Sequence, residues 1–151
     1  MTPIADLSRI ECSTFIKAPR SRVWRAITNM AEFSAWFQVK AEGEFAPGAR
    51  IRMTSLHPCG ANAVFHVTVD EIRPEESFSW RWHPGAERPA EESDEPMTRV
   101  EFRLTDEDGG TRVTVTESGF DQLSLERRAK AFKDNSNGWT MQMQALETYL
   151  A

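Results

Sequence analysis

The sequence predicts an α+β fold in which a curved antiparallel sheet wraps around one long C-terminal helix, with two short helices between the first and second strands. Near the C-terminus, Phe132, Trp139, Met143, Leu146 and Leu150 recur at spacings of seven, four, three and four, so they share one face of a helix. Most of the chain before this helix alternates apolar and polar residues, as strands with one buried face do. The long helix has to bury its apolar face, and the sheet is the large partner that can cover it.

One strand and two short helices precede the main run of strands. Residues 10–17 alternate imperfectly and stop before Pro19, which predicts the first strand. A helix follows, because proline suits a first helical turn, where its missing N–H costs little. This helix ends at Thr28-Asn29, and residues 30–37 form a second one, because their apolar side chains recur at helical spacing. The two helices make a V-shaped insert rather than a crossover to a parallel strand.

Six further strands alternate in the same way and are separated by turn residues. Gly109-Gly110 predicts a tight hairpin, because glycine accepts the positive φ that such turns require. Residues 84–96 are rich in acids and proline and are expected to form a solvated loop. The long helix is expected to begin at Ser124 or Asp121, since either side chain can cap it. The six strands are expected at residues 42–45, 49–56, 61–72, 78–82, 98–104 and 111–117.

The composition is that of a soluble globular protein with one domain, residues 1–151. The formal net charge of −5 argues against a nucleic-acid-binding groove or a membrane-docking surface, because both need clustered Lys and Arg. No apolar run approaches the ~20 residues of a membrane span, and residues 1–12 lack the apolar core of a secretory signal. Cys12 and Cys59 are too few for a disulfide framework, so we expect reduced thiols in a cytoplasmic protein.

Several short blocks, taken in order, carry a resemblance to a known superfamily. They are residues 16–19 (IKAP), 23–28 (VWRAIT), 36–37 (WF), 43–45 (GEF), 47–48 (PG), 78–82 (FSWRW), 113–120 (VTVTESGF) and 138–139 (GW). From about Leu7 to Leu150 the chain resembles the helix-grip, START-like or SRPBCC superfamily, and within it the group named after the activator of the heat-shock protein ninety ATPase. The resemblance implies an apolar cavity between the sheet and the C-terminal helix. It implies no single function, because this fold hosts lipid carriers, hormone receptors, cyclases and co-chaperone modules.

The inward-facing apolar residues define the candidate ligand-binding site. Aromatic side chains supply contact area, methionine adapts to irregular shapes, and Glu117 and Asn135 are the polar groups expected to orient a ligand. A core that these side chains fill completely is the alternative. The candidate ligand-binding residues are Trp36, Met53, Phe65, Trp80, Trp82, Phe102, Glu117, Asn135, Trp139 and Met143.

Gly138 lies inside the predicted long helix, where glycine costs about 1 kcal/mol relative to alanine. We expect a compensating reason, either a close approach of the helix to the sheet or a kink at the cavity. Simple tolerance of the glycine is the alternative.

Histidines, cysteines and acids form no clear metal or catalytic site in the sequence. His57 and Cys59 do not have a usual zinc spacing, and His66 and His83 are expected on the solvent side of their strands, so we predict no metal and no cofactor. A nucleophilic cysteine needs a partner base, and Cys59 has only His57 nearby, so we expect no catalytic residue. Glu117 is the one strand acid expected within reach of the cavity mouth, although solvated charge is the plainer interpretation for all the strand acids.

Arginines alternate with Glu101 on the expected outer face of the sheet, which indicates cross-strand charge pairs or, alternatively, a surface for an acidic partner. Together these features favour a binding protein that encloses a small apolar or amphipathic molecule, such as a lipid or polyketide. One alternative is a protein-interaction module like the chaperone-ATPase activators. Another is an enzyme of the cyclase or hydratase kind that uses the same cavity. We expect binding rather than catalysis, because the cavity contains no clear titratable group.

Overall fold

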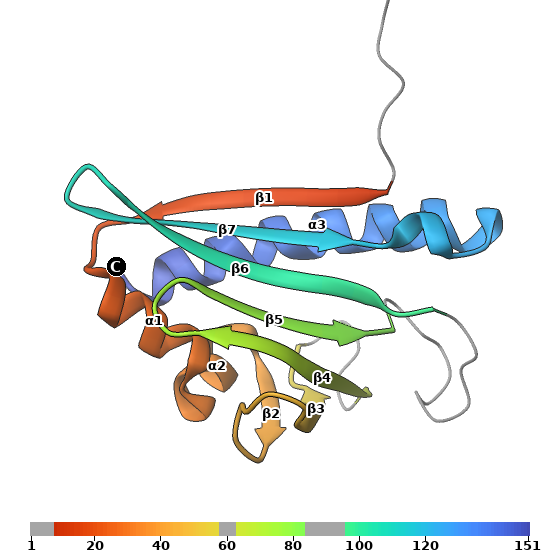
Figure 1. Cartoon of the computed structure of the whole chain (residues 1–151), viewed down its shortest axis with the longest axis horizontal. Helices are drawn as coiled ribbons and strands as arrows, with labels where there is room; N and C mark the ends of the chain where they lie inside the picture. Colours follow the sequence, from red (N-terminus) through yellow and green to blue (C-terminus); the bar gives the residue numbers. More distant parts are fainter. Residues whose placement is uncertain (1–7, 58–62, 84–95) are drawn as a thin grey trace, which may run out of the picture.

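The computed structural model describes residues 8–57, 63–83 and 96–151. Seven strands form one antiparallel sheet, and they are β1 (Arg9–Ile16), β2 (Val39–Glu42), β3 (Arg50–Ser55), β4 (Val64–Arg73), β5 (Ser77–Trp82), β6 (Thr98–Glu107) and β7 (Gly110–Ser118). Their order across the sheet is β1-β7-β6-β5-β4-β3-β2 (Figure 1). The pairing of β4 with β5 shifts register between Val69 and Ile72, and such an irregularity bends a sheet. The predicted α+β helix-grip architecture is therefore confirmed.

Two short helices, α1 (Arg20–Thr28) and α2 (Met30–Phe37), connect β1 to β2 as predicted. The Asn29 side chain accepts a hydrogen bond from the backbone N–H of Glu32 (3.1 Å) and so caps α2. After β7, a short 3-10 helix η2 (Phe120–Gln122) leads into the long helix α3 (Leu125–Tyr149). Ser124 caps α3 by accepting from the backbone N–H of Arg127 (3.3 Å), which decides between the two predicted caps.

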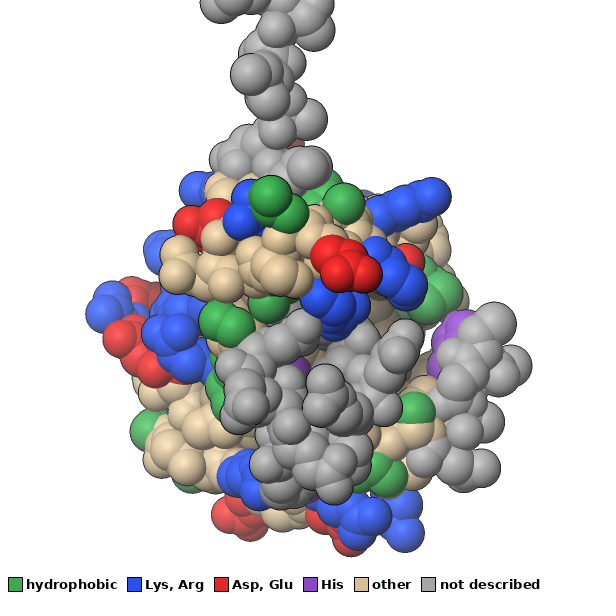
Figure 2. Space-filling view, turned by 90° about the vertical axis from the view of Figure 1, so that its right-hand side faces the viewer, with side chains coloured by type: hydrophobic (Ala, Val, Ile, Leu, Met, Phe, Trp, Pro, Cys, Tyr) green, Lys and Arg blue, Asp and Glu red, His purple; other side chains and the backbone are tan. Residues whose placement is uncertain are grey.

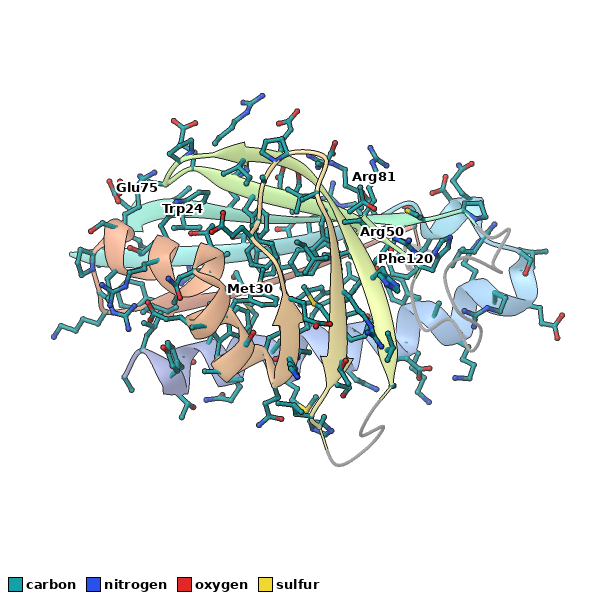
Figure 3. The ribbon with its side chains drawn as sticks, turned by 90° about the horizontal axis from the view of Figure 1, so that it is seen from below. Trp24, Met30, Arg50, Glu75, Arg81 and Phe120 are labelled. Atoms are coloured by element: carbon teal, nitrogen blue, oxygen red, sulfur yellow. The ribbon has the colours of Figure 1, made fainter. Side chains whose placement is uncertain are left out.

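Helix α3 turns its predicted apolar face to the sheet. Trp139, Met143 and Leu146 are buried, and the Trp139 ring centroid lies 5.7 Å from that of Phe102 and 6.4 Å from that of Trp80. Figure 3 shows side chains filling the layer between the sheet and the helices, with the labelled Trp24 toward one end and Phe120 toward the other. The centre of the molecule is a packed aromatic core, so space for a ligand has to lie beside it.

Some element boundaries differ from the predicted ones. The strand expected at residues 42–45 lies at Val39–Glu42 instead, and the chain leaves it at Gly43, which has a φ of 107°. The predicted hairpin after β6 is present, with positive φ at Asp108 (44°) and Gly109 (79°). Most of the expected acidic loop, residues 84–95, lies outside the described residues.

A cluster of four side chains, here called the clamp, ties the C-terminal end of α3 to α1 and α2. Glu32 accepts hydrogen bonds from Arg22 (2.7 Å), Arg25 (2.6 Å) and the hydroxyl of Tyr149 (2.9 Å). Burial alone would raise the pKa of Glu32, but these three donors hold it below its ordinary value. Figure 1 shows the C-terminus beside α1, where the clamp closes this end of the molecule.

Charged side chains of both signs cover the outer face of the sheet. Arg99 donates to Asp70 (2.9 Å) and Glu101 (3.3 Å), and Arg103 donates to Glu101 (3.2 Å), so the predicted charge pairs are present. Burial alone would lower the pKa of Arg99, but the two neighbouring acids raise it. Figure 2 shows the molecule from the right-hand side of Figure 1, and on that side too Lys and Arg side chains lie beside Asp and Glu side chains.

No helix in the described ranges combines the length and the apolar character that crossing a bilayer requires.

Candidate functional site

A pocket of about 420 Å³ opens between strands β3 to β5, the end of α2 and the middle of α3. Its wall is mostly aromatic and aliphatic, with histidine, amide and hydroxyl side chains among them. The lining residues are Phe37, Gln38, Val39, Ser55, His57, Ala63, Val64, Phe65, His66, Trp82, His83, Asn135, Gly138, Trp139, Met141 and Gln142. Residues from four separate parts of the sequence meet here because the middle of α3 faces β3, β4 and the end of β5 across the pocket.

A buried carboxyl group holds part of this wall in place. Glu117 is 0% exposed and accepts hydrogen bonds from Trp82 Nε1 (2.8 Å), Trp139 Nε1 (2.8 Å) and Thr98 Oγ1 (2.5 Å). Asn135 Nδ2 donates to both carboxyl oxygens of Glu117, at 2.9 and 3.1 Å. Three of these four donors line the pocket, so Glu117 lies directly behind the wall.

The position of Glu117 follows from the alternation of β7. It shares the buried side of the strand with Val113 and Val115, and it pairs across the sheet with Ile10 on β1 and Val100 on β6. The interpretation of Glu117 as a solvated charge is therefore wrong. A buried carboxyl group is tolerated only when its oxygens find donors, and the indole, amide and hydroxyl groups supply them.

The indole N–H groups of Trp82 and Trp139 are held by Glu117, and the rings of both residues pack against neighbouring aromatic side chains. The centroids of Trp82 and Trp139 are 5.9 Å apart with the rings inclined at 34°. Phe65 lies 5.8 Å from Trp82, and Phe37 lies 6.1 Å from Trp139. Because their N–H groups are turned toward Glu117, these indoles offer a ligand mainly apolar surface.

The structure divides the ten candidate ligand-binding residues into two groups. Four of them line the pocket: Phe65, Trp82, Asn135 and Trp139. The other six are buried and lie outside its lining: Trp36, Met53, Trp80, Phe102, Glu117 and Met143. Trp36, for example, donates its indole N–H to the backbone carbonyl of Ala26 (2.8 Å) inside the packed core.

Several lining residues were not anticipated from the sequence, and the histidines are the clearest case. His66 and His83 were expected on the solvent side of their strands, but both are half-buried and line the pocket together with His57. The Nδ1 atom of His83 is buried and has no hydrogen-bond partner within the described residues. The alternation of a strand does not show that its end is covered by a helix from elsewhere in the chain, and this explains the error.

The described residues contain no group of three His, Cys, Asp or Glu side chains arranged to hold a metal ion. Cys12 is a half-buried free thiol, while Cys59, considered above as a nucleophile, lies outside the described residues.

Gly138 faces the pocket rather than the packed sheet. A Cβ atom built at this position would meet no atom within 4 Å. The expectation that Gly138 allows a close approach between helix and sheet is therefore wrong. The glycine instead leaves open space beside Trp139, in the middle of an uninterrupted helix.

Comparisons with known proteins place this geometry in a family. A search of curated protein sequences finds no significant match. Among solved structures, protein MLL2253 from Mesorhizobium loti is similar, with 24% identity, 94% of this chain and 96% of that chain covered, and a TM-score of 0.75.

Two further structures share the fold. DynU16, described as a protein in the dynemicin biosynthetic locus, is 23% identical, with 95% of this chain but 47% of that chain covered and a TM-score of 0.74. The Aha1 dimer from Colwellia psychrerythraea is 17% identical, with 94% and 95% covered and a TM-score of 0.72. The family model described as "Activator of Hsp90 ATPase homolog 1-like protein" matches residues 17–151, and the chain belongs to this family.

Proposed function

We propose that this protein binds a small apolar or amphipathic molecule, such as a lipid or polyketide, in the pocket between β3 to β5 and α3. The observation that carries the proposal is the wall itself, an aromatic surface whose indole N–H groups are turned away from the pocket onto Glu117. Pockets for small ligands are typically of this kind, concave and largely apolar with a few placed polar groups.

The pocket is large enough for binding of moderate strength. A ligand that buries about 200 Å² of apolar surface gains about 5 kcal/mol before the entropic costs of association. The wall needs little reorganisation, because Trp82, Asn135 and Trp139 are already held by Glu117. The likeness to DynU16, described as belonging to a biosynthetic locus, also fits a fold that handles small molecules. A cytoplasmic location is part of the proposal, since the free thiol of Cys12 suits a reducing compartment.

Filling the pocket from α3 tests the proposal directly. Gly138→Leu places a side chain in the open space, whereas Asn137→Leu adds the same side chain at the neighbouring exposed position of the helix. Binding of the neutral dye Nile red is measured by its fluorescence for both variants and for the unaltered protein. We expect Gly138→Leu to weaken binding about tenfold or more and Asn137→Leu to leave it unchanged. Equal binding by all three proteins, or no binding by any, contradicts the proposal.

A second candidate function, activation of a chaperone ATPase, is favoured by the family description. The outer face of the sheet, with Arg81, Arg99 and Arg103 among Asp70 and Glu101, would then be the contact surface. ATP hydrolysis by purified Hsp90 is measured with and without the protein and with Arg81→Glu. An increase that the substitution removes supports this function, and an unchanged rate of hydrolysis excludes it.

A further inference from the structure

We infer that the pocket selects ligands that carry a neutral hydrogen-bond donor, such as a phenol or alcohol, over matched ethers and carboxylic acids. This inference rests on the proposed function of the pocket and adds the chemistry of its ligand. It follows from the direction in which Glu117 holds the side-chain amide of Asn135.

The two carboxyl oxygens of Glu117 determine which way the side-chain amide of Asn135 is turned. Trp139 Nε1 reaches Oε1 and Trp82 Nε1 reaches Oε2, each at 2.8 Å. An indole N–H can only donate, so both carboxyl oxygens act as acceptors. The group of Asn135 that approaches the same two oxygens must therefore be its NH₂ group, at 2.9 and 3.1 Å. The chemistry of the neighbours thus fixes the orientation of the amide, which its shape alone would leave ambiguous.

The carbonyl oxygen of the Asn135 side chain is left to accept a hydrogen bond from a ligand. With Nδ2 on Glu117, the carbonyl oxygen Oδ1 of Asn135 points away from the carboxyl group, and Asn135 lines the pocket. Among the hydrogen bonds of the described residues, none is accepted by this oxygen. An amide oxygen accepts up to two hydrogen bonds. A ligand hydroxyl beside Trp82 and Trp139 would satisfy it, while the rings cover the apolar part of the same ligand.

The surroundings of Glu117 disfavour a negatively charged ligand. Among the described residues, the hydrogen-bond partners of Glu117 are two indoles, one amide and one hydroxyl, and none of them is a cation. A ligand carboxylate placed at Asn135 would meet a carbonyl oxygen, with the carboxyl group of Glu117 one side chain behind it. An ether oxygen at the same place would also put acceptor against acceptor. Both therefore lose the hydrogen bond that a hydroxyl forms.

Three ligands with the same apolar body separate these cases: 4-heptylphenol, 4-heptylanisole and 4-heptylbenzoate. Their affinities are measured by isothermal titration calorimetry at about pH 8. We expect the phenol to bind about five- to tenfold tighter than the anisole, the value of one net hydrogen bond, and tighter than the benzoate. Asn135→Ala should bring phenol and anisole to within about twofold. Asn137→Ala, which removes an exposed amide from the same helix, should keep the preference.

The outcomes distinguish this inference from the proposed function. If all three ligands bind with similar affinity, or the benzoate binds best, the preference for a donor is overturned while the binding function stands. If none binds, the proposed function falls and the inference falls with it. A measurement on the unaltered protein covers the case in which Asn135→Ala fails to fold. The ¹³C resonance of the Asn135 side-chain carbonyl should move with 4-heptylphenol and stay in place with 4-heptylanisole, and the reverse pattern overturns the inference.

Discussion

The middle and the C-terminal end of α3 each depend on one acidic side chain, and the two acids work differently. In the clamp, Glu32 is held by two arginines and a tyrosine hydroxyl. Beside the pocket, Glu117 is held by two indoles, an amide and a hydroxyl. The clamp joins three helices at a closely packed end of the molecule, whereas the Glu117 network orients side chains that line the pocket.

The comparison shows how the choice of partners sets the role of a carboxyl group. Arginine neutralises charge and can reach in from the surface with a long side chain, so the clamp tolerates partial exposure of its members. Indole and amide groups bring apolar surface with their donors, so the same hydrogen bonds that satisfy Glu117 also build a wall for a ligand. A carboxyl group paired with cations is suited to joining elements, and one paired with neutral donors is suited to shaping a pocket.

The largest expected effect on stability comes from removing the Glu117 network. Glu117→Leu leaves the N–H groups of Trp82 and Trp139 and the amide of Asn135 without their acceptor. We expect the free energy of unfolding to fall by about 3–5 kcal/mol, because each unsatisfied buried donor costs about 1–3 kcal/mol. Urea denaturation measures the change. Glu32→Leu in the clamp is the matched control, with a smaller loss because its partners can turn to solvent. An equal or larger loss from Glu32→Leu would contradict this difference.

Two glycines sharpen the contrast between filled and open space. A Cβ atom at Gly110, the first residue of β7, would lie 2.5 Å from the carbonyl oxygen of Ile16 and 2.8 Å from the Phe15 ring at the end of β1, so Gly110→Ala should destabilise the fold by about 1–3 kcal/mol. Gly138→Ala meets no atom within 4 Å and gains helix propensity, so it should stabilise the fold by up to about 1 kcal/mol. Thermal unfolding of both variants tests the prediction, and a destabilised Gly138→Ala variant would show that its surroundings are not open.

The clamp should make stability depend on pH in the acid range. The pKa of Glu32 is lower in the folded state than its ordinary value of 4.5, so its contribution is complete above that pH. The contribution disappears as pH falls from about 4.5 through the lower folded-state pKa, because in this range the unfolded chain binds a proton at Glu32 more readily than the folded protein does.

Glu32→Gln tests this dependence. At pH 7 it should cost about 1–2 kcal/mol, since charged hydrogen bonds become neutral ones. The difference from the unaltered protein should shrink below pH 4.5. Urea denaturation at several pH values provides the measurement, with Glu44→Gln, at an exposed position, as the control. A difference that stays constant with pH would show that the acid acts only through its shape.

The smallest expected effect lies on the exposed side of α3, away from both networks. Lys130 and Asp134 form an ion pair at 2.7 Å with both side chains more than half exposed. Lys130→Ala should change the free energy of unfolding by at most about 0.5 kcal/mol, because water screens such pairs. A change as large as that of Glu32→Gln would mean that surface charge contributes as much as the clamp does.

Local patterns in the sequence were enough to predict the elements of this fold. The spacing of Trp139, Met143 and Leu146 marked the face of α3 that the structure buries, and Ser124 was one of its two predicted caps. Alternation marked the strands within a few residues. These predictions hold because local periodicity decides which side chains an element can bury together.

The same alternation also bears on Glu117. In β7 this acid has the parity of Val113 and Val115, so an inward carboxyl group with buried donors could have been inferred from the sequence.

The position of the pocket and the residues that line it depend on the tertiary structure and could not be predicted from local patterns. Met141 on α3, Gln38 after α2 and His83 after β5 are far apart in the chain, and they meet because α3 crosses the sheet at a particular place and angle. No periodicity within one element encodes that crossing, which depends on how all the buried side chains pack together. The tertiary structure also turned Gly138 toward open space and separated four lining residues from six core residues that looked the same in the sequence.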